Sequence, residues 1–595
     1  MATDQQVQEF VHRIEEGRWA KWVQLGALIA VMVAMFGSFI LDPWYWGLYK
    51  GLNHPKAMEQ GQIARELARG HGFTTKMIRP LAYNQIRSKK GFFPASRIPD
   101  TYQAPLWPIT LAPFFKLVQA WPDSLIPYRP AVKDRWQLTT RDYIYVGDRM
   151  MSAVASIFFF LTVLVSYLTV RRLFDHYVGI LTVLMMLGCN LFWQYSLSGL
   201  PQMLMAFLFS GALYSLVRAM EVHALNRWPY GWLALASVFF GALTLTHGIA
   251  AWIFVGAFLF SIIYFKPRWK TAVLMGGIFL LVYSPWIMRN YRACGTPFGV
   301  SAYSALEQIK GSENSIMRSQ DMDTTGVSPS TFRRKIQIHI SSELGNLFSS
   351  LGGTLVAPVF FLALLHLFRN PLPRSFRWAL LLMWLFAVLG MSVFSLSEEG
   401  SVMASCDLNI VFVPTFLAFG IAFILVLWTR LEIGVKLVKH AFFVLIFGIS
   451  SLPLINYMTT GTKSPVQWPP YVPPYIGILR DWTQPEEVIA SDMPWAVAWY
   501  ADRKSLWLPL SIQSFLDFND YEHMGSKMAG IYLTPISGNK ALISEIVKGD
   551  YKEWAPFILR NVNIKDFPLR SVTAMPLDNQ CIFYSDRDRW TDKMD

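Results

Sequence analysis

The chain has 595 residues, of which 53% are hydrophobic, 15% are aromatic and only 16% are charged. Charged residues usually make up about a quarter of a soluble domain, and here several windows of about 20 residues contain none, so the composition excludes an ordinary soluble protein and indicates a polytopic membrane protein. The net charge of +13 is better explained by basic cytoplasmic loops than by nucleic-acid binding, and we expect no nucleic-acid partner.

The N-terminal segment, residues 1–21, is polar and mixed in charge, and the apolar run 22–41 that follows is long enough to cross a membrane. A cleavable signal peptide has a shorter apolar region behind a basic start. We therefore expect residues 1–21 to remain as a cytoplasmic segment and residues 22–41 to form the first span. A long polar loop, residues 42–145, comes next.

Within this loop, residues 53–80 read NHPKAMEQGQIARELARGHGFTTKMIRP. Pro55 suits the first position of a helix, and Gly70 suits the residue that ends one, because glycine tolerates positive φ. This pattern predicts a polar helix beside the membrane. Residues 105–121 are apolar but contain three prolines, which favours a helix in the membrane interface over a full span.

Ten further apolar segments predict spans, which with the first make eleven and place the two ends of the chain on opposite sides of the membrane. They lie near residues 150–170, 178–196, 200–217, 231–246, 249–265, 271–288, 346–368, 378–396, 408–428 and 440–457.

The charges of the loops predict the orientation. Three short loops, near residues 197–199, 247–248 and 397–407, contain no Lys or Arg. The alternate loops are basic, and cytoplasmic loops are the ones enriched in Lys and Arg. Their basic residues are Arg171, Arg172, Arg218, Arg227, Lys266, Arg268, Lys270, Arg369, Arg374, Arg377, Arg430, Lys436 and Lys439. The N-terminus is then cytoplasmic, whereas the loops 42–145 and 289–345 and the tail from residue 458 lie outside.

The tail differs in character from the rest of the chain. It begins with the proline-rich segment PVQWPPYVPP and continues with short apolar runs that alternate with helical stretches, a pattern typical of a small α/β domain. The predicted fold is an α-helical polytopic membrane protein of about 11 transmembrane helices with a C-terminal extracytoplasmic α/β domain. Its three parts are a cytoplasmic N-terminal segment (residues 1–21), a transmembrane domain with its outside loops (residues 22–457) and a soluble extracytoplasmic α/β domain (residues 458–595).

Charged residues on the outside are the candidates for chemistry. Lys56, Glu59 and Arg79 could hold an anionic lipid headgroup or an acceptor. The alternative is a solvated helix in which Lys56 and Glu59 form only an i,i+3 ion pair. His247, at an outside turn between two spans, is a further candidate for substrate binding, although a single His in such a turn is more often a structural residue.

Arg289 and Arg292 lie one helical turn apart where the seventh span meets the outside. Arginine side chains bind phosphate well. Basic residues at a helix end can instead extend toward the interface, but the outside is the wrong side for that arrangement. No HExxH or CxxC pattern occurs, and the four cysteines are scattered, so no metal or cofactor is predicted.

Several motifs in their order resemble a known family. They are HPKAMEQGQIAREL (54–67), APLWP (104–108), VGDRMMSAV (146–154), YSLSGLPQMLM (195–205), PWIMRN (285–290) and SDMPWAVAWYADRKSLWLP (491–509). Together with the topology, they resemble the GT-C membrane glycosyltransferases, specifically the protein mannosyltransferases and the lipid A aminoarabinose transferases. The resemblance covers nearly the whole chain.

The resemblance implies a sugar transfer from a polyprenyl-phosphate donor to a lipid, glycan or protein acceptor at the outer face of a bacterial inner membrane, in contact with membrane lipids. In the family, an Asp in the first loop acts as base or positions the acceptor. Here the corresponding position is Lys56, and its acidic neighbour is Ala57. The chain has Asp407-Leu408-Asn409 where many relatives have an Arg-Tyr pair.

Glu59 and Asp42 are the nearest acids that could replace the missing carboxylate, and Glu59 is the preferred candidate for the base. Two alternatives to an active enzyme remain. The substitution at Lys56 favours a catalytically degenerate scaffold that binds lipid-linked glycan or organises a membrane complex. A transporter is disfavoured because no paired half-repeats occur and the spans are nearly free of charge.

Overall fold

The structure is a computed structural model. It describes residues 49–595 apart from residues 93, 96, 119–143, 308, 310–314, 323–326, 395–406, 432–435, 461–470, 539–542, 563–566, 576–580 and 591–595, and it describes five isolated residues between 26 and 37. The segment 1–21 and Asp42 lie outside the described residues, as does most of the predicted first span 22–41.

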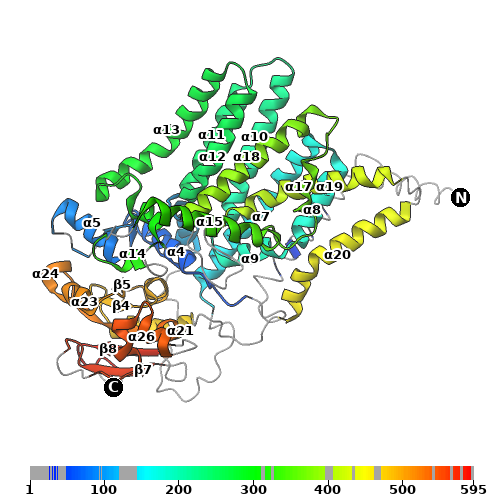
Figure 1. Cartoon of the computed structure of the whole chain (residues 1–595). Coiled ribbons are helices and arrows are strands. Elements are labelled where there is room, and N and C mark those ends of the chain that lie inside the picture. The colour runs from blue at the N-terminus through cyan, green and yellow to red at the C-terminus, as the bar shows by residue number, and fades with distance from the viewer. Residues whose placement is uncertain are drawn as a thin grey trace.

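The molecule has two main layers (Figure 1). A bundle of long apolar helices, which we call the membrane body, occupies the upper part of the view. A mixed sheet with its helices, which we call the tail domain, lies below it. Helices from the loop 42–145 and from the loop 289–345 lie between the two layers, and we call this side of the bundle the tail side.

Six helices among the described residues are long and apolar enough to cross a membrane, which confirms a multi-pass integral membrane protein. They are α7 (Val146–Leu173), α10 (Gln202–Ala224), α13 (Arg268–Cys294), α18 (Pro371–Phe394), α19 (Asn409–Arg430) and α20 (Lys436–Thr460). The pair α8 (His176–Gly188) and α9 (Asn190–Ser198), bent by 58°, counts as a seventh span if it is taken as one.

The predicted set of eleven spans is only partly confirmed. The predicted span 346–368 is wrong, because α16 (Leu347–Ser350) and α17 (Val359–Ala363) are short and separate. Gly352 and Gly353 between them both have positive φ, a conformation that ends a helix. Two further apolar helices are shorter than a full span, α11 (Tyr230–Thr246) and, after the turn η4 (Gly248–Ala250), α12 (Ala251–Tyr264).

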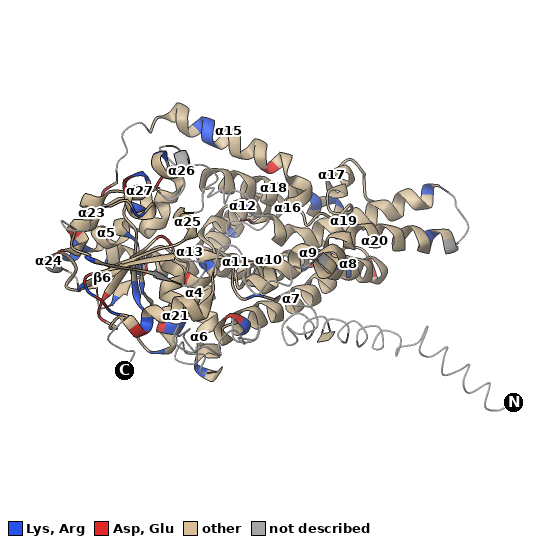
Figure 2. Cartoon of the chain, turned by 90° about the horizontal axis from the view of Figure 1, so that it is seen from below, with Lys and Arg blue, Asp and Glu red and all other residues tan. Residues whose placement is uncertain are grey.

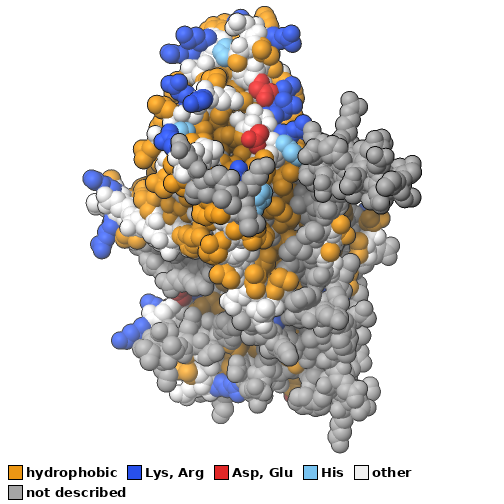
Figure 3. Space-filling model, turned by 90° about the vertical axis from the view of Figure 1, so that its right-hand side faces the viewer, with side chains coloured by type: hydrophobic (Ala, Val, Ile, Leu, Met, Phe, Trp, Pro, Cys, Tyr) orange, Lys and Arg blue, Asp and Glu red, His pale blue; other side chains and the backbone are white. Residues whose placement is uncertain are grey.

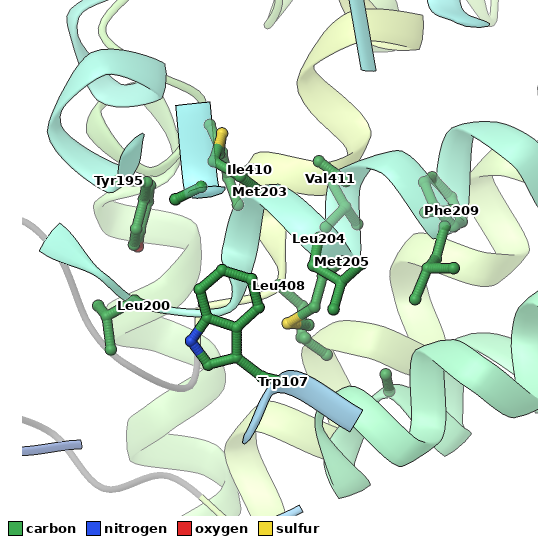
Figure 4. Close-up of a cluster of buried hydrophobic side chains, with 14 of the residues drawn as sticks. Trp107, Tyr195, Leu200, Met203, Leu204, Met205, Phe209, Leu408, Ile410 and Val411 are labelled. Atoms are coloured by element: carbon green, nitrogen blue, oxygen red, sulfur yellow. The ribbon is translucent and has the colours of Figure 1, made fainter. Parts of the chain in front are cut away.

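Helix α6 (Leu106–Val118) is 13 residues long and packs against α4 and α7. Its Trp107 is fully buried and donates from Nε1 to the carbonyl oxygen of Gly199 over 3.0 Å. The ring lies among apolar side chains of α9, α10 and α19 (Figure 4). Burial of so large a side chain joins the loop 42–145 to the membrane body.

Charged side chains are concentrated around the tail side and at helix ends, whereas the long helices carry few along their lengths (Figure 2). In a side view, Lys and Arg gather at the end of the membrane body far from the tail domain, next to a band of hydrophobic side chains (Figure 3). Some of these cations are paired, since Arg172 and Arg218 both bind Glu221, over 3.2 and 2.5 Å.

The tail domain contains a six-stranded sheet in the order β2-β5-β4-β6-β8-β7. Its strands are β2 (Met77–Ile78), β4 (Val488–Ser491), β5 (Lys504–Trp507), β6 (Met528–Leu533), β7 (Ser571–Met575) and β8 (Cys581–Ser585). Strands β2, β5, β4 and β6 are parallel to one another, whereas β8 pairs antiparallel with both β6 and β7. The edge strand β2 comes from the loop 42–145, about 400 residues before its partner β5, so the loop and the tail share one sheet.

Helices surround this sheet and fill the loops. In the tail they are α21 (Pro473–Trp482), α22 (Pro494–Ala496), η6 (Val497–Ala501), α23 (Ile512–Asn519), α24 (Tyr521–Met524), α25 (Pro535–Gly538), α26 (Ile543–Lys548), η7 (Lys552–Trp554) and α27 (Ala555–Ile558). The loops supply α4 (Pro55–Ala68), α5 (Pro80–Lys90), η5 (Gly299–Leu306), α14 (Ser315–Arg318) and α15 (Pro329–Gly345), and a small sheet of β1 (Thr74–Thr75) and β3 (Ile98–Pro99).

Helix α4 begins and ends as the sequence predicts. Pro55 is its first residue, the side chain of His54 caps it by accepting from the N–H of Lys56, and Gly70 follows with φ +81°. The interpretation of α4 as a solvated helix is wrong, because ten of its residues, from Ala57 to Glu66, are buried.

An ion cluster around Asp502 explains this burial and holds α4 to the tail domain. Arg65 donates to Asp502 over 3.1 Å and also to the carbonyl oxygens of Ala498 and Trp499. Arg69 and Lys76 bind the same carboxylate over 2.8 and 2.5 Å. Buried charges of this kind are stable only when they are paired.

The loop 289–345 is joined to both layers as well. Arg318 of α14 donates to the carbonyl oxygen of Leu508 over 2.7 Å, which fixes α14 on the tail domain. Lys335 of α15 donates to the carbonyl oxygens of Ala305 and Val393 over 2.9 and 3.0 Å. The loop therefore contacts α18 and the tail domain together.

Candidate functional site

A cavity of about 470 Å³ opens on the tail side of the membrane body. Its wall is formed by α4, the segment 101–104, the turn between α11 and α12, α13, η5, the end of α18 and two residues of the tail domain. This volume is in the range of small-molecule sites. The cavity is where the loop 42–145, the membrane body and the tail domain meet.

Lys56 and His247 meet in this cavity. The Nζ atom of Lys56 lies 2.7 Å from Nε2 of His247, although 191 residues separate them. Lys56 is in the first turn of α4, and His247 follows α11 with an extended backbone. This contact holds the side chain of Lys56 against the imidazole of His247.

Glu59 lies one turn further along α4 and forms a buried ion pair with Arg79, whose guanidinium is 2.5 Å from the carboxylate. The side-chain amide of Gln103 also donates to Glu59. Burial lowers the pKa of Arg79, but Glu59 together with Tyr102 and Asp100 raises it, and the net shift is upward. The guanidinium also lies 3.9 Å from the ring centroid of Tyr102, a cation–π contact.

Asp100 organises the segment that presents Gln103. Its carboxylate accepts from the N–H groups of Tyr102 and Gln103 over 3.0 and 2.6 Å. Burial raises the pKa of Asp100, and Arg79 opposes that rise. This turn orients Gln103 toward Glu59, and sequence reasoning missed both residues because neither belongs to a recognisable motif.

Arg289 and Arg292 do not line the cavity. The Arg289 guanidinium donates to the carbonyl oxygens of Phe73 and Asp100 and to Oδ1 of Asn290. It lies between two rings, 5.1 Å from the centroid of Phe73 and 4.7 Å from that of Trp286. Arg292 is exposed. Arg289 therefore connects α13 to the loop 42–145.

The structure thus brings Lys56, Glu59, Arg79 and His247 together, and Asp42 lies outside the described residues. The tail residues Trp495 and Trp507, which the sequence analysis did not select, also line the cavity. Both lie in the segment 491–509 that carries part of the family resemblance, and that segment was the signal that could have indicated them. Among the described residues, no group of three or more His, Cys, Asp or Glu could hold a metal ion.

A second acidic pair lies apart from the cavity, where α19 begins. Burial, together with the nearby Glu343 carboxylate of α15, raises the pKa of Asp407 to about 7 against the lowering effect of its hydrogen bonds. Asp407 accepts from the hydroxyl of Tyr195 over 3.3 Å and from the N–H of Asn409 over 2.7 Å. The side chain of Asn409 in turn donates to Glu343 over 3.1 Å. These acids therefore connect α9, α15 and α19.

Comparison with known protein families finds one family model that matches part of the chain. Residues 145–288 match the family model described as dolichyl-phosphate-mannose-protein mannosyltransferase. A comparison with curated proteins finds no match. The resemblance to the GT-C membrane glycosyltransferases is therefore confirmed, with the family model matching α7 to α13.

Solved structures extend the likeness to the whole chain. ArnT from Cupriavidus metallidurans bound to undecaprenyl phosphate is similar with a TM-score of 0.53 and 11% identity, over 95% of this chain and 99% of that one. The oligosaccharyltransferase of Archaeoglobus fulgidus in the apo form is similar with a TM-score of 0.52 and 12% identity, over 91% and 73% of the two chains. At these identities the likeness shows the fold. The chain has an ArnT-like fold, a helical membrane body with a C-terminal mixed sheet.

Proposed function

We propose that this protein is an integral membrane glycosyltransferase that moves a sugar from a polyprenyl-phosphate donor to an acceptor hydroxyl in the cavity of Lys56 and Glu59. The observation that supports this most is the presence of one carboxylate, Glu59, and two cations, Lys56 and Arg79, in a single cavity of an ArnT-like fold. ArnT itself was solved with undecaprenyl phosphate bound, a lipid of the proposed donor class.

The proposed reaction is a displacement at the anomeric carbon. The acceptor oxygen forms a bond to that carbon, the bond between the carbon and the phosphate oxygen breaks, and polyprenyl phosphate leaves with the bonding electrons. The acceptor proton passes to Glu59, which lines the cavity. A positioned carboxylate contributes about 10²–10⁴-fold to such a proton transfer.

The cations of the cavity match the charge of the leaving group. Lys56 is at the position where relatives carry an Asp, so it cannot act as that base, but its ammonium suits a phosphate oxygen. Arg79 lines the same cavity, and its buried Nε has no hydrogen-bond partner among the described residues. Lys56 and Arg79 are thus the proposed donors to the phosphate, with His247 orienting Lys56.

The proposed location is a bacterial inner membrane. The basic ends of the spans lie away from the tail domain, and basic ends face the cytoplasm in most membrane proteins. The cavity and the tail domain would then face the periplasm. The acceptor is a lipid, a glycan or a protein in that compartment.

A specific observation favours a second candidate function. Glu59 is already bound by Arg79 and Gln103, so an acceptor hydroxyl would have to compete with both groups for the carboxylate. With Lys56 in place of the family Asp, the same cavity could bind lipid-linked glycan without transferring the sugar. The chain would then be a catalytically degenerate scaffold.

The test is sugar transfer by the purified full-length protein in nanodiscs, with a panel of radiolabelled polyprenyl-phosphate sugars and a membrane extract as acceptor. We expect transfer by the wild type and a loss of about 10²–10⁴-fold in Glu59→Gln, with donor binding retained. The matched control is Glu486→Gln, at an exposed site of the tail. Full activity of Glu59→Gln would exclude Glu59 as base, and an inactive wild type that still binds donor would favour the scaffold.

A further inference from the structure

We propose that Trp495 and Trp507 of the tail domain form a carbohydrate-binding wall of this cavity, so that the acceptor is a glycan. This inference rests on the proposed function in one respect, because a bound glycan is an acceptor only if the protein transfers sugar. The glycan-binding property itself can be tested without any transfer reaction.

The two tryptophans are firmly positioned. Their ring centroids are 5.7 Å apart and the ring planes are nearly perpendicular, at 89°. Trp495 donates from Nε1 to the hydroxyl of Tyr471 over 3.0 Å. Only 8% of Trp495 and 6% of Trp507 is exposed, and both residues line the cavity. The rings therefore form two rigid apolar surfaces at right angles.

This wall adjoins the proposed base. The Arg79 guanidinium lies 5.9 Å from the ring centroid of Trp507, and the same guanidinium binds Glu59 over 2.5 Å. Arg79 is therefore a neighbour of both Glu59 and Trp507. An acceptor whose hydroxyl reaches Glu59 lies on the side of the cavity that Trp507 lines.

A buried polar atom of the cavity also requires a partner. Thr101 is more than nine-tenths buried and lines the cavity. Its hydroxyl has no hydrogen-bond partner among the described residues, and it remains for the acceptor because the Arg79 guanidinium is assigned to the donor phosphate. A buried polar atom without a partner is costly, and a ligand with hydroxyl groups would satisfy it.

The combination selects a carbohydrate. A sugar ring has an apolar C–H face that packs on an aromatic ring and an edge of hydroxyls that pair with polar side chains. A polyprenyl chain would leave the Thr101 hydroxyl unsatisfied. It is better matched by the aromatic residues that the membrane helices supply to the same cavity, Trp252, Tyr283 and Trp286. The two sets divide the cavity into a membrane side and a tail side.

The direct test is saturation-transfer NMR on the full-length protein in nanodiscs, with the trimers of glucose and of N-acetylglucosamine and a serine-containing hexapeptide as probes. We expect saturation transfer to at least one trimer and none to the peptide. Trp507→Ala should abolish the glycan signal, Trp507→Phe should retain most of it, and thermal stability measured in parallel identifies a variant that fails to fold. Trp228→Ala, at an 80% exposed position between α10 and α11, is the matched control and should bind like the wild type.

In the transfer assay, Trp507→Ala should raise the acceptor KM by roughly tenfold or more, as loss of an aromatic contact implies, and leave the donor KM unchanged. Glycan binding by an inactive wild type would support the wall and reject the enzyme. Transfer to peptides without glycan binding would overturn the wall and leave the enzyme standing. A wild type that binds neither trimer, or a folded Trp507→Ala variant that binds both normally, would also overturn the wall.

Discussion

Lys56 and His247 are brought together across 191 residues of sequence, with Nζ of Lys56 2.7 Å from Nε2 of His247. The contact joins α4, which belongs to the loop 42–145, to the turn between two membrane helices. The resemblance aligns Lys56 with a family acid, so a cation stands at that position in this chain. We therefore propose that Lys56 binds the phosphate of a donor and does not accept the proton of an acceptor.

Replacing Lys56 tests this role. Lys56→Met keeps an unbranched apolar side chain but loses the charge, and a hydrogen bond to a charged group contributes about 1.5–3 kcal/mol. The affinity for undecaprenyl phosphate, measured by microscale thermophoresis, should fall by roughly 10–100-fold. The control Lys548→Met, at an exposed site on α26, should bind normally. Equal affinity of Lys56→Met and the wild type would remove Lys56 from the phosphate site.

Arg289 is expected to affect stability more than binding. Its guanidinium contacts Phe73, Asp100, Trp286 and Asn290, so Arg289→Ala leaves several buried groups unpaired. We expect a loss of about 1–3 kcal/mol, visible as a lower Tm in scanning fluorimetry, with little change in donor affinity once folded. Arg292→Ala, at an exposed site, should change neither the Tm nor the donor affinity. A stable Arg289→Ala variant with weakened donor binding would restore Arg289 as a phosphate ligand.

Asp502 should control docking of the tail domain. Burial alone would raise its pKa, but Arg65, Lys76 and Arg69 hold the pKa of that carboxyl well below its usual range. Asp502→Asn leaves these cations without their charge partner, which costs about 3–5 kcal/mol for a buried pair. We expect faster trypsin cleavage of the tail domain, whereas Asp588→Asn, at an exposed site, should be cut like the wild type.

The lowered pKa of Asp502 also predicts how docking of the tail domain depends on pH. A carboxylate with a depressed pKa stabilises the folded state above its unfolded value of about 4 and loses that contribution as the pH falls toward its folded pKa. Tail docking through Asp502 should therefore be constant between pH 7 and 5 and weaken only below about pH 4. Weakening that begins at pH 6 would point to another titrating group.

The orientation can be tested by labelling in intact cells. On a background with Cys406→Ser, a cysteine introduced at Arg587 of the tail domain should react with a membrane-impermeant maleimide, and one introduced at Arg430 should not. The basis is the collection of basic side chains at the end of the membrane body far from the tail domain. The opposite labelling pattern would place the cavity in the cytoplasm and contradict the proposed donor side.

Local features of the chain were predictable because they depend on neighbouring residues. Pro55 and Gly70 mark the ends of α4, and apolar length alone indicated the long spans. The break at Gly352 and Gly353 was missed, because composition over 20 residues does not show that two glycines adopt positive φ.

Long-range features were not predictable from one sequence. The charges of Arg65 and Arg69 suggested a solvated helix, but their partner Asp502 lies more than 430 residues away. The edge strand Met77–Ile78 is only two residues long and joins a sheet built by the tail. The candidates Lys56, Glu59, Arg79 and His247 were identified as separate outside residues, and only the fold shows that they share a cavity.

The most direct test of the account is the position of the phosphate in a cryo-EM map of the full-length protein with undecaprenyl phosphate in nanodiscs. We expect the phosphate in the cavity, within hydrogen-bonding distance of Lys56 and Arg79, with the lipid chain beside the aromatic residues of α12 and α13. A phosphate bound at Arg292 or at any face outside this cavity would contradict the assignment of the donor site.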